Sequence, residues 1–104
     1  MSLSGNVWVV DDDRSIRWVL EKALTADGID NTLFDSADVL MQALERNTPD
    51  AIISDIRMPG TDGLALLEHI QNTNPQIPII IMTAHSDLDS AVASYKGGAF
   101  EYLP

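Results

Sequence analysis

The sequence predicts an α/β protein built around a parallel β-sheet. Short runs of apolar, β-branched residues alternate with segments in which apolar residues recur at the spacing of a helix. This alternation is typical of βα units, in which each helix crosses the sheet to join two parallel strands. The chain has 104 residues, which suits one domain with a single hydrophobic core.

Five apolar runs are predicted to be strands. Three of them are apolar throughout, as strands covered by helices on both faces must be, and we expect these at the centre of the sheet: 7–10, 51–53 and 79–82. The other two, 31–34 and 100–103, are only partly apolar. We expect these two strands at or near the edges of the sheet.

Four helices are predicted between the strands, because apolar residues recur there every three or four positions. The segments are 16–24, 40–44, 66–70 and 88–95. Gly28 ends the first helix and Gly97 with Gly98 ends the last. Ser36, Asp38 and Asp62 are candidate caps for the second and third helices.

The composition excludes several classes of protein. With 6 basic and 16 acidic side chains the formal net charge is −10, so we expect no direct binding to nucleic acid. The longest apolar run, 79–82, is far shorter than the roughly 20 residues that span a membrane. There is no cysteine and no signal peptide, so the cytoplasm is the expected location. Residues 1–5 are interpreted as a cloning remnant.

Acidic residues and one hydroxyl follow three of the predicted strands. Asp11, Asp12 and Asp13 come after the first strand, Asp55 ends the third, and Thr83 ends the fourth. In an open parallel sheet, ligands bind beyond the carboxyl ends of the strands, so these side chains are expected to converge. Clustered carboxylates repel one another unless a cation holds them, and oxygen donors of this kind favour Mg²⁺. Asp55, on a central strand, is the best candidate for a nucleophile that accepts a phosphoryl group.

A structural interpretation of the acidic run is also open. Aspartate is favoured at helix N-caps, and we expect Asp13 to cap the first helix. Taken alone, Asp11 to Asp13 fit a capped helix with solvated acids equally well. Combined with Asp55 and Thr83 at equivalent strand ends, the run favours a functional site.

Three motifs together resemble the receiver domains of bacterial two-component response regulators. They are the runs 9–13 (VVDDD), 54–63 (SDIRMPGTDG) and 81–84 (IMTA). Runs 14–21, 54–59 and 82–87 are similar to the nitrogen regulatory protein C group, whose members activate transcription with sigma-54 polymerase. The resemblance implies a flavodoxin-like, doubly wound sheet of five parallel strands in the order 2-1-3-4-5.

The resemblance also implies a role for each matching residue. Asp55 would accept the phosphoryl group from a sensor histidine kinase. Mg²⁺ would be held by Asp12, Asp55, the backbone carbonyl of Arg57 and, through water, Asp11. The phosphate and switch residues would be Thr83, Ala84 and Tyr102, and the side chains of Arg57 and His85 would tune the lifetime of the phosphorylated state. Pro59, Gly60 and Gly63 are expected to shape the loop after Asp55 so that its backbone can approach the ion.

One departure from the family pattern lies at the end of the chain. The family places a lysine directly after the Leu-Pro that ends the fifth strand, and a closing fifth helix follows, whereas this chain ends at Pro104. We therefore interpret residues 1–104 as a receiver domain truncated at its C-terminal end, with a strip of helix and sheet surface exposed. Either phosphorylation is then impaired or another chain covers the gap.

The predicted function is a phosphorylation-dependent switch in which the fourth helix region, 87–98, responds to phosphate at Asp55. The implied partners are the kinase, C-terminal AAA+ and DNA-binding output domains outside this chain, and a second receiver. Two alternatives stay open. Asp11, Asp13 and Ser15 resemble the nucleophile motif of haloacid dehalogenase-type phosphatases, with Asp11 as nucleophile. The missing lysine also fits a pseudo-receiver that binds partners without carrying phosphate.

Overall fold

The computed structural model describes residues 5–82 and the backbone of 100–103. Its centre is a five-stranded parallel sheet in the order β2-β1-β3-β4-β5. The strands are β1 (Asn6–Val10), β2 (Asp30–Phe34), β3 (Ala51–Asp55), β4 (Ile79–Met82) and β5 (Phe100–Leu103). The predicted α/β class and strand order are confirmed, and the two partly apolar strands lie at the edges.

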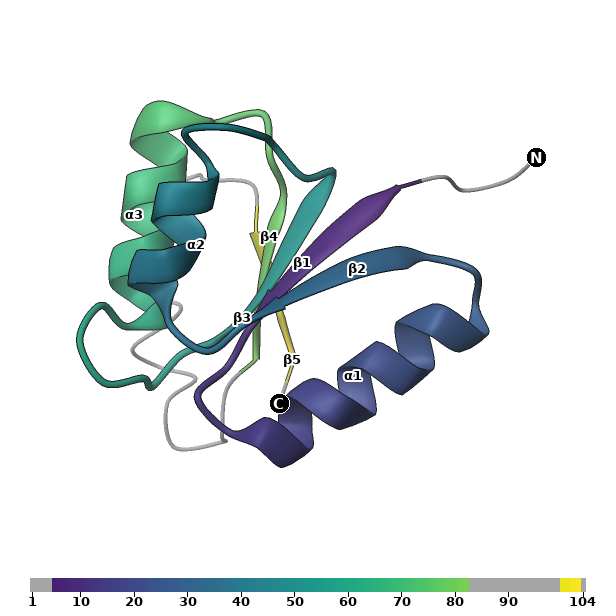
Figure 1. Cartoon of the computed structure of the whole chain (residues 1–104). Helices are drawn as coiled ribbons and strands as arrows, with labels where there is room; N and C mark the ends of the chain where they lie inside the picture. Colours follow the sequence, from purple (N-terminus) through teal and green to yellow (C-terminus); the bar gives the residue numbers. More distant parts are fainter. Residues whose placement is uncertain (1–4, 83–99, 104) are drawn as a thin grey trace.

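In the described part of the chain, three helices lie on the two faces of the sheet. Figure 1 shows α1 (Arg14–Ala26) on one face and α2 (Ala37–Ala43) with α3 (Gly63–Thr73) on the other. Together with the parallel pairing, this arrangement makes the fold doubly wound. The fourth helix predicted over 88–95 lies outside the described residues.

Each described helix begins at a side chain that caps its first turn. Asp13 Oδ1 accepts a hydrogen bond from Ser15 N, and Asp62 Oδ1 accepts one from Ala65 N. Ser36 caps α2, so Asp38, the other candidate, lies in the first turn of that helix and not at its cap. Gly28 adopts φ 74° just after α1, a left-handed conformation that favours glycine.

The hydrophobic core lies between the sheet and the α2–α3 face. Leu40 of α2, Leu66 of α3 and Ile52 of β3 are fully buried there. Trp8 and Phe34, from neighbouring strands, pack with ring centroids 5.1 Å apart. The continuous apolar strands therefore bury one face against these two helices.

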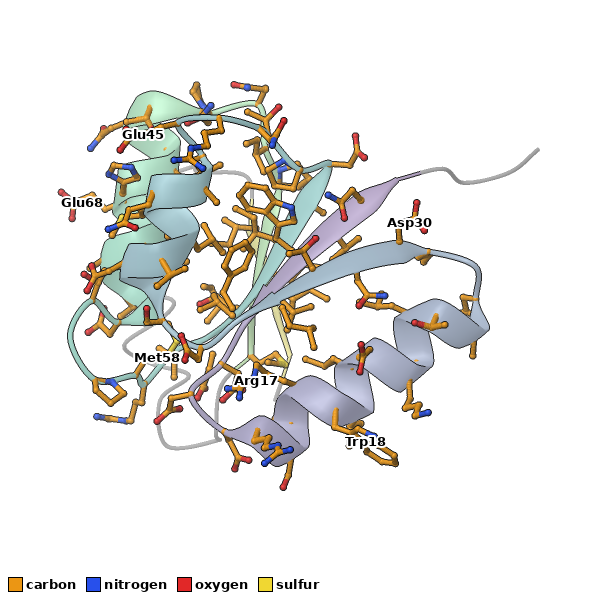
Figure 2. The ribbon with its side chains drawn as sticks, in the orientation of Figure 1. Arg17, Trp18, Asp30, Glu45, Met58 and Glu68 are labelled. Carbon is orange, nitrogen blue, oxygen red and sulfur yellow. The ribbon has the colours of Figure 1, made fainter. Side chains whose placement is uncertain are left out.

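Among the described residues, the helix on the opposite face packs less closely. None of the residues of α1 is buried, although its predicted apolar stripe is present. Ile16 is 39% exposed and Val19 is 54% exposed. Trp18 points away from the sheet, as Figure 2 shows, and Lys22 Nζ lies 5.6 Å from its ring centroid. None of the described helices has the length and apolar character needed to cross a membrane.

Candidate functional site

The register of the central strands brings the acidic residues together. β1 and β3 are adjacent and parallel, with Val10 paired to Ser54, so the residues that follow this pair emerge side by side at the same edge of the sheet. One carboxylate oxygen from each of Asp11, Asp12 and Asp55 lies within 4.8 Å of the other two. The predicted convergence of the first and third strand ends is therefore observed.

Asp11 is the buried member of this cluster, with only 2% of its surface exposed. Its Oδ1 accepts a hydrogen bond from Asp13 N at 2.8 Å, and its own N donates to Phe34 O on β2. Burial raises the pKa of Asp11 to about 6, and the charge of Asp55 adds to this effect, while the Asp13 hydrogen bond opposes it. The folded chain therefore disfavours the ionised form of Asp11.

Asp12 and Asp13 are both exposed and have different surroundings. Asp12 contributes its carboxylate to the cluster. Asp13 instead uses Oδ1 to cap α1, as the sequence predicted. Two residues of the acidic run therefore belong to the cluster, and the third caps the helix.

Asp55 is the last residue of β3 and is half-buried. Its Oδ1 accepts a hydrogen bond from Ile56 N at 2.8 Å, which fixes the orientation of the carboxylate. Its backbone carbonyl accepts a hydrogen bond from the buried Ser54 hydroxyl, also at 2.8 Å. The nucleophile candidate is therefore held through both its side chain and its main chain.

The loop between β3 and α3 turns tightly around Asp55. A Cβ atom at Gly63 would lie 2.2 Å from Asp55 O, so only glycine fits there. Gly60 adopts φ 77° and needs glycine for its conformation. Both glycines shape this loop, as predicted, but for Gly63 the reason is its approach to the Asp55 backbone.

The donor set fits a hard divalent cation. Carboxylate oxygens are the ligands that Mg²⁺ prefers, and its bonds of about 2.1 Å place opposite ligands about 4.2 Å apart. The three carboxylates already bring oxygens to within 4.8 Å of one another, close to that span. Asp12 and Asp55 would hold the ion directly, and Asp11 would hold it through water.

The structure also reveals positioning contacts that sequence reasoning missed. Arg17 Nη1 donates to the carbonyl of Asp11 at 2.5 Å, tying α1 to the turn that carries the cluster. Figure 2 shows this side chain on the sheet-facing side of α1. Helical side chains lean toward the N-terminus of the helix, and this geometry could have identified Arg17. The role of Ser54 could not be predicted in this way, because its hydroxyl donates only to the carbonyl of the next residue, Asp55.

Several predicted site residues lie beyond the described part of the chain. These are Thr83, Ala84 and His85, and the side chain of Tyr102. The backbone around them is partly described: Tyr102 pairs with Ile81, and Met82 pairs with Asp55. Met82 O also accepts a hydrogen bond from Ile56 N, so β4 ends beside the acidic cluster.

Comparisons with known proteins agree on one family. Residues 7–104 match the response regulator receiver domain. The chain is 60% identical over 100 residues to the DNA-binding transcriptional regulator NtrC of Klebsiella pneumoniae, covering 96% of this chain and 21% of that protein. It thus spans about a fifth of the length of the curated relatives it matches.

Two solved structures show the same likeness. The solution structure of the apo receiver domain of nitrogen regulatory protein C is 60% identical, with a TM-score of 0.87, and the match covers 96% of this chain and 81% of that one. The structure described as a transiently phosphorylated switch in bacterial signal transduction is also 60% identical. Its TM-score is 0.83, with the same coverage of both chains.

Proposed function

This chain belongs to the response regulator receiver domain family, and on that premise we propose that it is a signalling switch phosphorylated at Asp55. The observation that carries the proposal is the meeting of Asp11, Asp12 and Asp55 at the carboxyl edge of the sheet. Among the three, Asp55 is the half-buried residue that ends a central strand and is oriented by Ile56 N.

The reaction is the transfer of a phosphoryl group from a phosphohistidine. A carboxylate oxygen of Asp55 attacks phosphorus, a new oxygen–phosphorus bond forms, and the nitrogen–phosphorus bond breaks. The electron pair of the broken bond stays on the imidazole of the donor. The product is an acyl phosphate on Asp55 and a dephosphorylated histidine.

Mg²⁺ would neutralise the charge that three carboxylates and a phosphoryl group bring together. Asp12 and Asp55 would bind it directly, the carbonyl of Arg57 would be a further ligand, and Asp11 would act through water. The raised pKa of Asp11 supports this assignment, because a buried carboxylate among other acids is stabilised by a bound cation.

The output of the switch is the second part of the proposal. Phosphate at Asp55 would draw in Thr83, with Ala84 leaving space beside it and Tyr102 moving in response. Arg57 and His85 would set how long the phosphate survives. The region 87–98 would then change its contacts with a transcription-activating output domain, with AAA+ and DNA-binding parts, or with a second receiver.

Incubation with acetyl phosphate and Mg²⁺, followed by intact mass measurement, tests the acceptor. Wild type should gain one phosphoryl group, and Asp55→Asn should gain none. Asp30→Asn, an exposed aspartate at the start of β2, is the matched control and should be phosphorylated like wild type. Wild type that gains no mass would instead support the pseudo-receiver alternative.

The haloacid dehalogenase-type alternative requires Asp11 as nucleophile. Asp11 is 2% exposed, and one of its carboxylate oxygens is engaged by Asp13 N, so the approach of a substrate is hindered. A phosphatase of this type would hydrolyse phosphate esters with turnover. That activity would be lost in Asp11→Asn and retained in Asp55→Asn.

A further inference from the structure

A hydrogen bond ties the loop after β3 to a helix that is distant in sequence. Thr61 Oγ1 donates to Asp38 Oδ1 at 2.7 Å, joining the loop to the first turn of α2. The other oxygen of the same carboxylate, Oδ2, lies 3.4 Å from the point that a Cβ atom would occupy if residue 60 had a side chain. Both oxygens of Asp38 therefore face the tip of the loop, and the positive φ of Gly60 brings the tip to them.

The ends of this loop are anchored independently of Asp38. Ile56 and Met58 are buried in the core cluster, 5% and 8% exposed. Gly63 N donates to Ile56 O at 2.8 Å and closes the loop at its base, and Asp62 caps α3. Arg57 lies between the two buried anchors, on the stretch that leads to the tip.

We propose that Asp38 and Thr61 are a positioning pair that holds the loop 57–61 in its Mg²⁺-binding conformation. The inference rests on the proposed function, which makes the carbonyl of Arg57 a ligand of the ion. The pair touches neither the ion nor the phosphoryl group. It acts by keeping the loop in one conformation, and the apparent dissociation constant rises in proportion as that conformation becomes less populated.

Titration of the full chain with Mg²⁺ alone, followed by calorimetry, measures this effect. Thr61→Val removes the hydroxyl and keeps the shape, and it should weaken Mg²⁺ binding about threefold to tenfold, as expected for the net loss of one solvent-exposed hydrogen bond. Thr61→Ser restores the hydroxyl and should bind within about twofold of wild type. Thr73→Val is the matched control, because Thr73 also donates its hydroxyl, to His69 O at the far end of α3.

A double-mutant cycle tests whether the two residues act together. In an Asp38→Ala background, Thr61→Val should weaken Mg²⁺ binding no further. In EDTA, Thr61→Val and Thr73→Val should have similar urea midpoints, which separates positioning from a loss of stability. Hydrogen exchange at the amides of 60 and 61 should be faster in Thr61→Val in the same buffer.

The outcomes separate this inference from the function on which it rests. If wild type binds Mg²⁺ and Thr61→Val binds it equally well, the positioning role is wrong and the switch proposal stands. The same holds if Thr61→Ser fails to restore binding, or if Thr73→Val weakens binding as much as Thr61→Val. If wild type binds no Mg²⁺, the metal site itself is wrong and the positioning role falls with it.

Discussion

Replacing Asp11 by asparagine should stabilise the metal-free protein. Burial, with the neighbouring acids, raises the pKa of Asp11 from 3.8 to about 6. Each pKa unit corresponds to about 1.4 kcal/mol, so ionised Asp11 costs the folded state about 3 kcal/mol. Asparagine keeps the Oδ1 atom that accepts the hydrogen bond from Asp13 N. We expect the free energy of unfolding to rise by about 1–3 kcal/mol near neutral pH, since the amide also loses some solvation.

The stabilisation produced by Asp11→Asn should decrease as the pH falls. Above the folded pKa of about 6 Asp11 is ionised in both states, and the full cost is present. Below the unfolded value of 3.8 it is protonated in both states, and the cost is gone. The difference in free energy of unfolding between Asp11→Asn and wild type should therefore shrink as the pH falls from about 7 to about 4.

Urea unfolding in EDTA, followed by circular dichroism and tryptophan fluorescence, measures the difference at each pH. Asp30→Asn, at an exposed position, should show no comparable gain. The reasoning is refuted if Asp11→Asn is no more stable than wild type at neutral pH, or if its advantage persists unchanged at about pH 4. Saturating Mg²⁺ should reverse the order, because the ion stabilises the variant less.

Two further predictions concern the core and the loop after β3. Leu40→Ala should lower the free energy of unfolding by about 2–5 kcal/mol, because Leu40 is fully buried, whereas Val39→Ala, at a 45% exposed position, should change it little; urea unfolding compares them. Gly63→Ala should both destabilise the protein and reduce phosphorylation, because its Cβ would displace the Asp55 backbone. Gly28→Ala should cost about 1 kcal/mol for its positive φ and leave phosphorylation unchanged, since no atom lies within 4 Å of that Cβ.

The sheet was predictable because each strand carries its own signal. The run 79–82 is a strand with the predicted bounds, and the partly apolar run at 31–34 lies at an edge. The first residue of a helix was equally predictable where a cap side chain accepts a hydrogen bond from a backbone N two or three residues later, as at Asp13 and Asp62. These features depend on interactions that are local in sequence or on burial periodicity.

The contacts that hold the site were harder to predict because they join distant parts of the chain. The bond between Asp38 and Thr61 depends on how α2 and the loop pack, and no short motif encodes it. Packing against α1 was also beyond prediction, since periodicity identifies its apolar stripe and says nothing about what covers Ile16 or Val19. The pattern of acids at strand ends did predict the cluster, because the topology of a parallel sheet fixes where strand ends meet.

The inner position of β1 has a consequence for how the protein folds. Both neighbours of β1 in the sheet, β2 and β3, come later in the chain than β1 itself. Its pairing with β3 is non-local, and non-local pairings of this kind slow folding because a long loop must close first. Asp55 arrives on β3, so the carboxylates meet only when this strand docks. Charge repulsion among the acidic residues is therefore introduced in the same step that pairs β3 with β1.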